Sequence, residues 1–176
     1  MEYLTRSELS RLFSVARKEN ELHWQMMVTA FYFGLRVSEV IAILGEDVQD
    51  NQLTVRRLKN SIRTLQPIPT TNGNPEFALR LVTLANTAGP RSKIFPLSRQ
   101  RCDQFMKRYC RLAGIHRRKA HFHAFKHSIA MAIWDVSKMP GQIKSYLGHR
   151  SMSSTMQYLN ESDSLKAQEV VSNLNY

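Results

Sequence analysis

The stretch 146-YLGHRSMSSTMQY-158 places one histidine and one tyrosine at a fixed offset across a turn. Leu147 and Gly148 are typical of a helix end, and the serines that follow can cap a new helix. Tyr158 then lies about one turn inside that helix, so His149 and Tyr158 can share a site. The sequence leaves a second interpretation open, in which Tyr158 packs an amphipathic helix and His149 is a polar turn residue.

A reactive tyrosine would need positive charge around it, because its hydroxyl has an ordinary pKa of about 10 and is a poor nucleophile. The chain carries 25 Lys and Arg residues against 14 Asp and Glu residues, a formal net charge of +11 over 176 residues. Such a basic excess indicates a nucleic-acid partner first and an anionic membrane surface second. The longest apolar run, 26–35, is far shorter than the roughly 20 residues of a membrane span, and no signal-peptide pattern is visible. We expect a soluble cytoplasmic protein.

Apolar residues recur mainly at helical spacing, which predicts one domain of the α+β class, mostly helical with one small antiparallel sheet. A T-x-x-E capping box at 5–8 marks the first helix. Strands are expected at 52–58 and 62–68, joined by a hairpin connection at 59–61. Lys59 at the hairpin tip is either a solvated turn residue or a cation that reaches outward. The expected helices are 5–20, 24–34, 40–44, 77–87, 98–112, 123–134, 140–147, 151–158 and 164–173.

The cysteine and histidine pattern argues against a metal centre. Cys102 and Cys110 sit eight residues apart on one expected helix, so a disulfide between them is geometrically implausible. The four histidines between positions 116 and 127 have no thiol partners at zinc-ligand spacing. We therefore expect neither a metal ion nor a cofactor.

Several basic residues stand where a phosphate could reach them. Arg36 lies between two apolar helices, and a guanidinium buried there needs either Glu39 or a phosphate as its partner. His123 and Lys126 are three residues apart and share one face of a helix. The basic run at 116–119 suits either a solvated loop or a DNA backbone.

Four segments together resemble the sequence boxes of the tyrosine recombinase (phage integrase) family, in the same order and spacing. GLRVSE at 34–39 is similar to the first arginine box, and RLKNS at 57–61 is similar to the β-hairpin lysine segment. HAFKHS at 123–128 is similar to the H-x-L-R-H-S box, and LGHRSMSSTMQY at 147–158 is similar to the final L-G-H and T-x-x-Y box. Each box is weak alone, but their agreement over nearly the whole chain is a strong joint signal. The resemblance implies the catalytic-domain fold of that family, with a small antiparallel sheet on one edge.

The resemblance also implies cleavage and rejoining of DNA strands without a metal ion or nucleotide. Tyr158 is the implied nucleophile, which attacks the scissile phosphate to form a 3′-phosphotyrosyl bond and release a 5′-hydroxyl. Lys59 would protonate the leaving oxygen, and His123 would act as base or orienter for Tyr158. The side chains implied to hold the non-bridging oxygens are Arg36, Lys126 and His149.

The implied partner is double-stranded DNA, bound by a dimer to tetramer of the chain and assisted by accessory DNA-bending proteins. Such enzymes are encoded by prokaryotes, phages and mobile elements, so the implied location is the nucleoid, and the outcome is integration, excision or inversion. Contacts to the DNA are expected from basic residues of the hairpin, of the 116–119 run and of the last box, namely Arg57, Arg63, Arg117, Arg118, Lys119 and Arg150.

The chain departs from the family pattern at two places. Lys126 stands where the family usually has its second arginine, and an ammonium cannot grip two phosphate oxygens in a fixed fork. The family's N-terminal core-binding domain is absent from the sequence, either because this is an excised fragment or because it is a minimal recombinase like the short fimbrial-switch invertases. We expect a catalytic domain over 1–161 and a helical tail over 162–176, which is exchanged between subunits or packs on its own domain.

Two other functions remain open at this stage. One is a catalytically weakened DNA-binding protein on the same fold, in which Lys126 marks decay of the site. The other is an enzyme similar to a type IB topoisomerase or a telomere resolvase, which shares the chemistry but relaxes supercoils or closes DNA ends.

Overall fold

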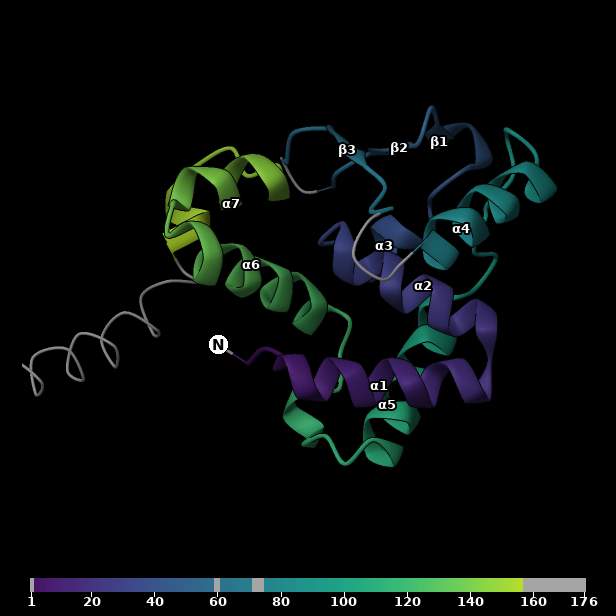
Figure 1. Ribbon diagram of the computed structural model, residues 1–176, viewed down its shortest axis with the longest axis horizontal. Helices are drawn as coiled ribbons and strands as arrows, with labels where there is room; N and C mark the ends of the chain where they lie inside the picture. Colours follow the sequence, from purple (N-terminus) through teal and green to yellow (C-terminus); the bar gives the residue numbers. More distant parts are fainter. Residues whose placement is uncertain (1, 59–60, 71–74, 157–176) are drawn as a thin grey trace, which may run out of the picture.

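The computed structural model describes residues 2–58, 61–70 and 75–156, and it confirms the mainly helical fold with a small antiparallel sheet (Figure 1). The described part contains α1 (Arg6–Glu19), α2 (Glu21–Tyr32), α3 (Val37–Val40), α4 (Pro75–Ala88), α5 (Arg99–Leu112), α6 (His123–Ser137) and α7 (Pro140–Leu147), the short 3-10 helices η1 (Gly45–Asp47) and η2 (Arg117–Lys119), and the strands β1 (Val48–Gln49), β2 (Gln52–Val55) and β3 (Thr64–Pro67). None of the helices in these ranges is long and apolar enough to cross a bilayer.

Local sequence signals fix several helix ends. The Thr5 hydroxyl accepts from the Glu8 N–H at 3.2 Å and the Glu8 carboxylate accepts from the Thr5 N–H at 2.8 Å, which confirms the capping box of α1. The Ser98 hydroxyl caps α5 as the sequence predicts. Gly148 ends α7 in the left-handed conformation at φ +65°, which also confirms the prediction for the stretch around it.

The sheet has the strand order β1-β2-β3, and both pairings are antiparallel. β1 was absent from the sequence prediction, and a turn at Asp50 and Asn51, both with positive φ, joins it to β2. The two predicted strands are shorter than expected because the backbone between them finds partners outside the sheet. Leu58 N–H donates to the Glu39 carboxylate at 3.1 Å, and Ile62 N–H donates to the Gly148 carbonyl at 2.8 Å. The hairpin is thereby bonded to the helices on either side of the candidate site.

Two further expectations need correction or fall outside the described ranges. The third predicted helix, 40–44, is replaced by the single turn α3, which ends at Val40, and Leu44 pairs instead with Lys93 in an isolated β-bridge. A helical turn covers 153–156, where the Tyr158 helix was predicted to begin. The predicted tail helix at 164–173 lies outside the described residues.

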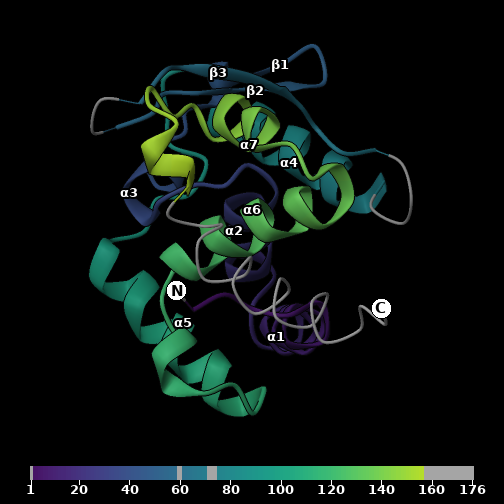
Figure 2. The ribbon, with the colours of Figure 1, turned by 90° about the vertical axis from the view of Figure 1, so that its left-hand side faces the viewer.

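α2 forms the centre of the core and contacts α1, α3, α4 and α6 (Figures 1 and 2). α6 contacts both α2 and α7, and α7 contacts β3 of the sheet. The largest fully buried side chains include the aromatic rings of Phe33, Phe77, Phe95 and Phe125. One charged side chain, Lys126, belongs to the same fully buried set, and the candidate site is built around it.

Candidate active site and nucleic-acid interface

Lys126 is a cation enclosed in the core. It lies on α6 with 0% exposure, and its Nζ has no hydrogen-bond partner among the described residues. Burial, followed by repulsion from Arg36 and Arg57, lowers the pKa of Lys126 to about 7, and Glu39 only partly offsets these effects. A buried ammonium without a partner is energetically costly, so this side chain is suited to receive an anion.

Arg36 comes from the junction between α2 and α3. Gly34, at φ +58°, turns the chain there, and a Cβ on it would lie 2.4 Å from the Leu147 Cδ2 atom. The Arg36 guanidinium donates to the Glu39 carboxylate at 2.9 Å, and the Arg36 backbone N–H donates to the same carboxylate at 2.8 Å. Glu39 is thus the internal partner of Arg36, one of the two partners that were predicted from the sequence. The arginine side chain remains 24% exposed, so it can also contact a phosphate.

Glu39 supplies negative charge to the cluster. Although burial opposes its ionisation, the backbone N–H groups of Arg36 and Leu58 donate to its carboxylate. Together with the charges of Arg57 and Lys126, these bonds hold the pKa of Glu39 below its ordinary value. One carboxylate is therefore surrounded by three cationic side chains, and the cluster retains an excess of positive charge.

His149 joins the cluster from the loop after α7. It is buried, and its Nδ1 lies 3.0 Å from the hydroxyl oxygen of Thr155, which is itself fully buried. Burial, followed by the charges of Lys126 and Arg36, lowers the pKa of His149 to about 4. Its imidazole is therefore neutral at neutral pH and can donate a hydrogen bond without carrying charge. Sequence reasoning did not include Thr155 in the site, although its place three residues before Tyr158 is a usable signal.

His123 opens α6 and is exposed at the surface of the site. Partial burial of its ring, followed by the charges of Lys126 and Arg36, lowers the pKa of His123 below its ordinary value. A cavity of about 350 Å³ adjoins it between α3 and the starts of α5 and α6, lined in part by Arg36, Arg99, His121 and His123. The cavity therefore adjoins two of the predicted catalytic residues, and its lining also includes Asp103.

The structure thus brings Arg36, His123, Lys126 and His149 into one electrostatically coupled cluster, because the charges of Arg36 and Lys126 lower the pKa of both histidines. The other two predicted catalytic residues, Lys59 and Tyr158, lie outside the described residues. Across the part of the chain that the structure describes, no group of three or more His, Cys, Asp or Glu side chains could hold a metal ion.

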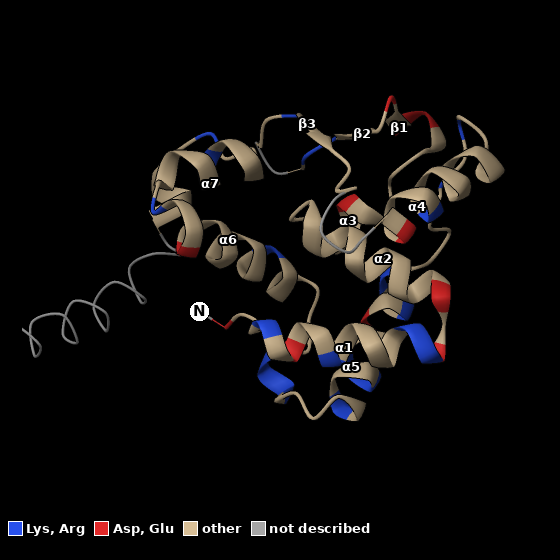
Figure 3. Cartoon of the chain, viewed as in Figure 1, with Lys and Arg blue, Asp and Glu red and all other residues tan. Residues whose placement is uncertain are grey.

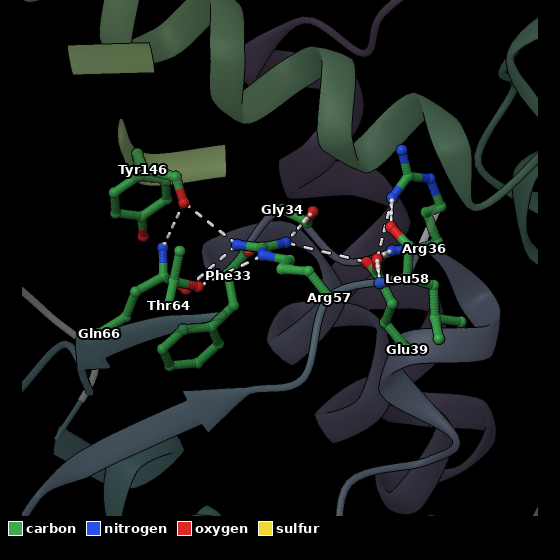
Figure 4. A network of polar contacts seen from close by, with 9 residues as sticks. All are labelled: Phe33, Gly34, Arg36, Glu39, Arg57, Leu58, Thr64, Gln66 and Tyr146. Atoms are coloured by element: carbon green, nitrogen blue, oxygen red, sulfur yellow. Dashed lines mark hydrogen bonds and ion pairs between the residues drawn. The ribbon is translucent and has the colours of Figure 1, made fainter. Parts of the chain in front are cut away.

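Arg57 was expected to contact DNA, but its side chain is buried and bonded inside the protein (Figure 4). Its side chain is 0% exposed. The guanidinium donates to the backbone carbonyls of Phe33, Gly34 and Tyr146, at distances between 2.9 and 3.1 Å. With these bonds inside the fold, it has no surface to offer to a DNA phosphate. Arg57 is therefore withdrawn from the expected DNA contacts.

The other expected DNA contacts divide into two groups. Arg63, Arg117, Arg118 and Arg150 are exposed. Lys119 is only partly exposed, and its ammonium donates to both carboxylate oxygens of Glu8, at 2.9 and 2.8 Å. The lysine thereby fastens η2 to α1, which makes it a weaker candidate for DNA than the four arginines.

A basic groove of about 890 Å³ lies between the second half of α5 and η2. Figure 3 shows Lys and Arg residues along both elements. The cations that line the groove are Lys107, Arg108, Arg111, Arg117 and Arg118. Exposed guanidinium groups at this density suit a polyanionic backbone.

Comparison with known proteins agrees with this fold. Residues 2–164 match the model of the phage integrase family, and the chain belongs to this family. A tyrosine recombinase of Pseudothermotoga lettingae is 25% identical over 171 residues, which cover 94% of this chain and 58% of that protein. The chain thus spans little more than half the length of this relative.

Solved recombinase structures share the fold. A XerH site-specific recombinase in a post-cleavage complex with a palindromic difH substrate has a TM-score of 0.75 and 16% identity, covering 97% of this chain and 52% of that one. A XerA recombinase has a TM-score of 0.73 and 20% identity, covering 100% and 66%. The catalytic domain of bacteriophage HP1 integrase has a TM-score of 0.69 and 18% identity, covering 91% and 88%. The family and the catalytic-domain fold that the sequence predicts are therefore confirmed.

Proposed function

We propose that the chain is the catalytic part of a site-specific DNA recombinase, which cleaves and rejoins DNA through a 3′-phosphotyrosyl intermediate at Tyr158. The observation that carries the proposal is the fully buried Lys126, whose Nζ is without a hydrogen-bond partner in the described ranges and lies within a cluster of excess positive charge. A stable fold tolerates such a group where an anionic ligand completes the site. Membership of the phage integrase family supports a scissile DNA phosphate as that anion.

The proposed reaction exchanges one phosphodiester bond for another. The Tyr158 hydroxyl oxygen attacks phosphorus in line, the bond from phosphorus to the 5′ oxygen breaks, and the tyrosine becomes linked to the 3′ phosphate. His123 takes up or orients the proton of Tyr158, for which its lowered pKa supplies the neutral imidazole. Lys59 gives a proton to the leaving 5′ oxygen. Rejoining is the reverse of these steps.

The cluster around Lys126 would stabilise the negative charge of the phosphate in the transition state. Arg36 and Lys126 would neutralise the non-bridging oxygens as negative charge builds, and neutral His149 would donate a hydrogen bond. Burial makes these interactions stronger than they would be in water. Contact with the phosphate would also raise the pKa of Lys126, because the anion favours the charged ammonium.

The DNA is proposed to run over the exposed basic surface of the domain. The proposed contacts are the exposed Arg63, Arg117, Arg118 and Arg150, with the partly exposed Lys119 as a weaker one. Binding that relies on such arginines releases condensed counterions, so the affinity should fall steeply with salt. The proposed assembly is a dimer to tetramer on DNA, helped by DNA-bending proteins and by exchange of the tail 162–176 between subunits.

Covalent trapping tests the proposal. The protein is incubated with nicked suicide duplexes that carry candidate sites from beside its own gene, with Tyr158→Phe as the matched control. The expected result is a denaturation-resistant adduct with the wild-type chain alone. Specific binding without an adduct would contradict cleavage and favour the weakened DNA-binding protein, for which the lysine at position 126 is the supporting observation. Relaxation of a supercoiled plasmid that lacks any specific site would favour a topoisomerase instead.

A further inference from the structure

We infer that Arg57 is a positioning residue of the active site, whose buried guanidinium holds together the three chain segments that lead to Arg36, Lys59 and His149. The inference rests on the proposed function, because it assigns these three residues to the reacting phosphate. Figure 4 shows the guanidinium at the centre of the contacts that join the segments.

The first segment is the C-terminal end of α2. Arg57 Nη1 donates to the Gly34 carbonyl and Nη2 donates to the Phe33 carbonyl, both at 2.9 Å. Carbonyls at a helix C-terminus lack partners within the helix and carry partial negative charge, so a cation is stabilising there. Arg36 follows Gly34 by two residues, and the guanidinium therefore fixes the backbone from which that catalytic side chain extends.

The second segment is the C-terminal end of α7. Arg57 Nη2 also donates to the Tyr146 carbonyl at 3.1 Å, and the Gln66 amide donates to the same carbonyl at 2.9 Å. A Cβ added to Gly148 would meet the Arg57 side chain at 3.4 Å, so the turn before His149 packs directly on the arginine. One guanidinium thus binds the ends of two helices, α2 and α7.

The third segment follows β2 and carries Arg57 itself. Glu39 lies 3.8 Å from Arg57 Nη1 and accepts from the Leu58 N–H at 3.1 Å. The same carboxylate binds Arg36 at 2.9 Å. Leu58, the residue before Lys59 in the sequence, is therefore bonded to the same carboxylate as Arg36.

The geometry requires arginine at this position. The donors of Arg57 point in several directions within one plane and reach carbonyls on two helices, the Gln66 side chain at 3.4 Å and the Thr64 hydroxyl at 3.3 Å. A lysine ammonium is a point donor on a flexible stem and cannot bridge both helix ends at once. A Lys at this position would keep the charge and lose the bridge.

Three variants test the inference on suicide duplexes of the kind described above. Arg57→Gln and Arg57→Lys remove the bridge, the second without changing charge. Arg56→Gln is the matched control, since Arg56 is the adjacent residue but is exposed and pairs with Glu46 and Asp47 instead of with the helix ends. The cleavage rate at saturating protein, the Kd for an uncleaved duplex and the melting temperature are measured for each protein, with rates taken well below the lowest melting temperature.

The expected result is a cleavage rate at least about tenfold lower for both Arg57 variants, since misplaced catalytic groups typically cost this much or more. The Kd should stay within about twofold of the wild type for Arg57→Lys, because the exposed arginines that bind DNA are unchanged. Arg56→Gln should keep the wild-type rate. Folded Arg57 variants that cleave at the wild-type rate would overturn the inference, and so would an equal loss of rate in Arg56→Gln.

A second substrate separates positioning from general loss of structure. When the leaving 5′ oxygen is replaced by sulfur, the leaving thiolate needs no proton, because a thiol has a pKa of about 8.5. If Arg57 helps to place Lys59, the ratio of sulfur to oxygen cleavage rates should rise in Arg57→Lys. A ratio equal to that of the wild type would overturn the claimed hold on the Lys59 segment.

The experiments distinguish a failure of the proposed function from a failure of the role inferred for Arg57. A wild-type chain that forms no adduct would contradict the proposed function, and the inference would fall with it. A wild-type chain that cleaves while the folded Arg57 variants cleave equally well would leave the proposed function standing and remove only the inference.

Discussion

Lys126→Met should stabilise the folded chain near neutral pH, because it removes an ammonium that is buried without a hydrogen-bond partner in the described structure. The pKa of Lys126 is about 7 in the folded chain, against 10.5 for an ordinary lysine. The unfolded chain therefore binds more protons between these two values, so the stability of the wild type rises with pH across that window. The full penalty of the charge is present below about pH 7. Methionine has a similar length and no charge, and it removes the pH-dependent part.

The size of the effect follows from the pKa. At about 1.4 kcal/mol per pKa unit, the difference between about 7 and 10.5 corresponds to a penalty of up to about 5 kcal/mol at low pH. Near pH 9, roughly two units above the folded pKa, about 3 kcal/mol of the penalty is relieved. The charged and titratable groups that surround the lysine are present in both proteins and largely cancel in the comparison, namely Arg36, Glu39, Arg57, His123 and His149.

Urea denaturation of both proteins at about pH 6 and about pH 9 measures this effect. The free energy of unfolding of the wild type should rise by roughly 3 kcal/mol between these conditions relative to Lys126→Met. Lys126→Arg serves as the control, since its guanidinium stays charged at both values of pH. An equal difference between wild type and Lys126→Met at both pH values would refute the buried, titrating lysine. It would also remove the main reason for assigning this residue to a phosphate.

Three further predictions concern other parts of the site. Because burial holds the pKa of His149 near 4, acidification below about pH 6.5 should lower the melting temperature, and His149→Gln should show a smaller loss. Replacing both Arg117 and Arg118 with glutamine should weaken DNA binding, reduce the slope of log Kd against log salt by about two, and leave the cleavage rate at saturation unchanged. Gly148→Ala should lower the free energy of unfolding by about 1 to 3 kcal/mol, because φ is +65° and the new Cβ would lie 2.4 Å from the Ile62 carbonyl oxygen. Gly141→Ala is the control and should not destabilise the chain, because the space around Gly141 is open.

The helices were readable from the sequence because their signals are local. The capping box at 5–8, the Ser98 cap and the Gly148 helix end each involve residues within one turn of one another, and all three are present in the structure. The catalytic boxes were recognised in the same way, as short patterns in a fixed order. The family match then confirmed the family that the four boxes together indicated.

The role of Arg57 was not recognised, because its contacts come from residues distant in the sequence. Its partners Phe33 and Tyr146 lie 24 and 89 residues away. A weaker signal was nevertheless available, since Leu53 and Val55 occupy the buried face of β2 and the alternation continues to position 57. An arginine on the inward face of a strand predicts an internal partner rather than a DNA phosphate.

The charge state of Lys126 was also beyond the sequence. Its place beside His123 on α6 could be predicted from their spacing, but its complete burial depends on how α6 packs in the folded chain. The sequence showed a lysine where the resembling family usually has its second arginine. Only the fold shows that this lysine has no internal hydrogen-bond partner among the described residues, so the lysine affects the stability of the folded chain as well as the proposed reaction.

Peptide mapping of the trapped adduct is the most direct test of the central claim. The protein would be trapped on a suicide duplex, the DNA trimmed with nuclease, and the modified peptide identified by mass spectrometry. We expect a nucleotide joined through its 3′ phosphate to the peptide that contains Tyr158, with a free 5′-hydroxyl on the released strand. A nucleotide on any other residue, or a link through the 5′ phosphate, would contradict it.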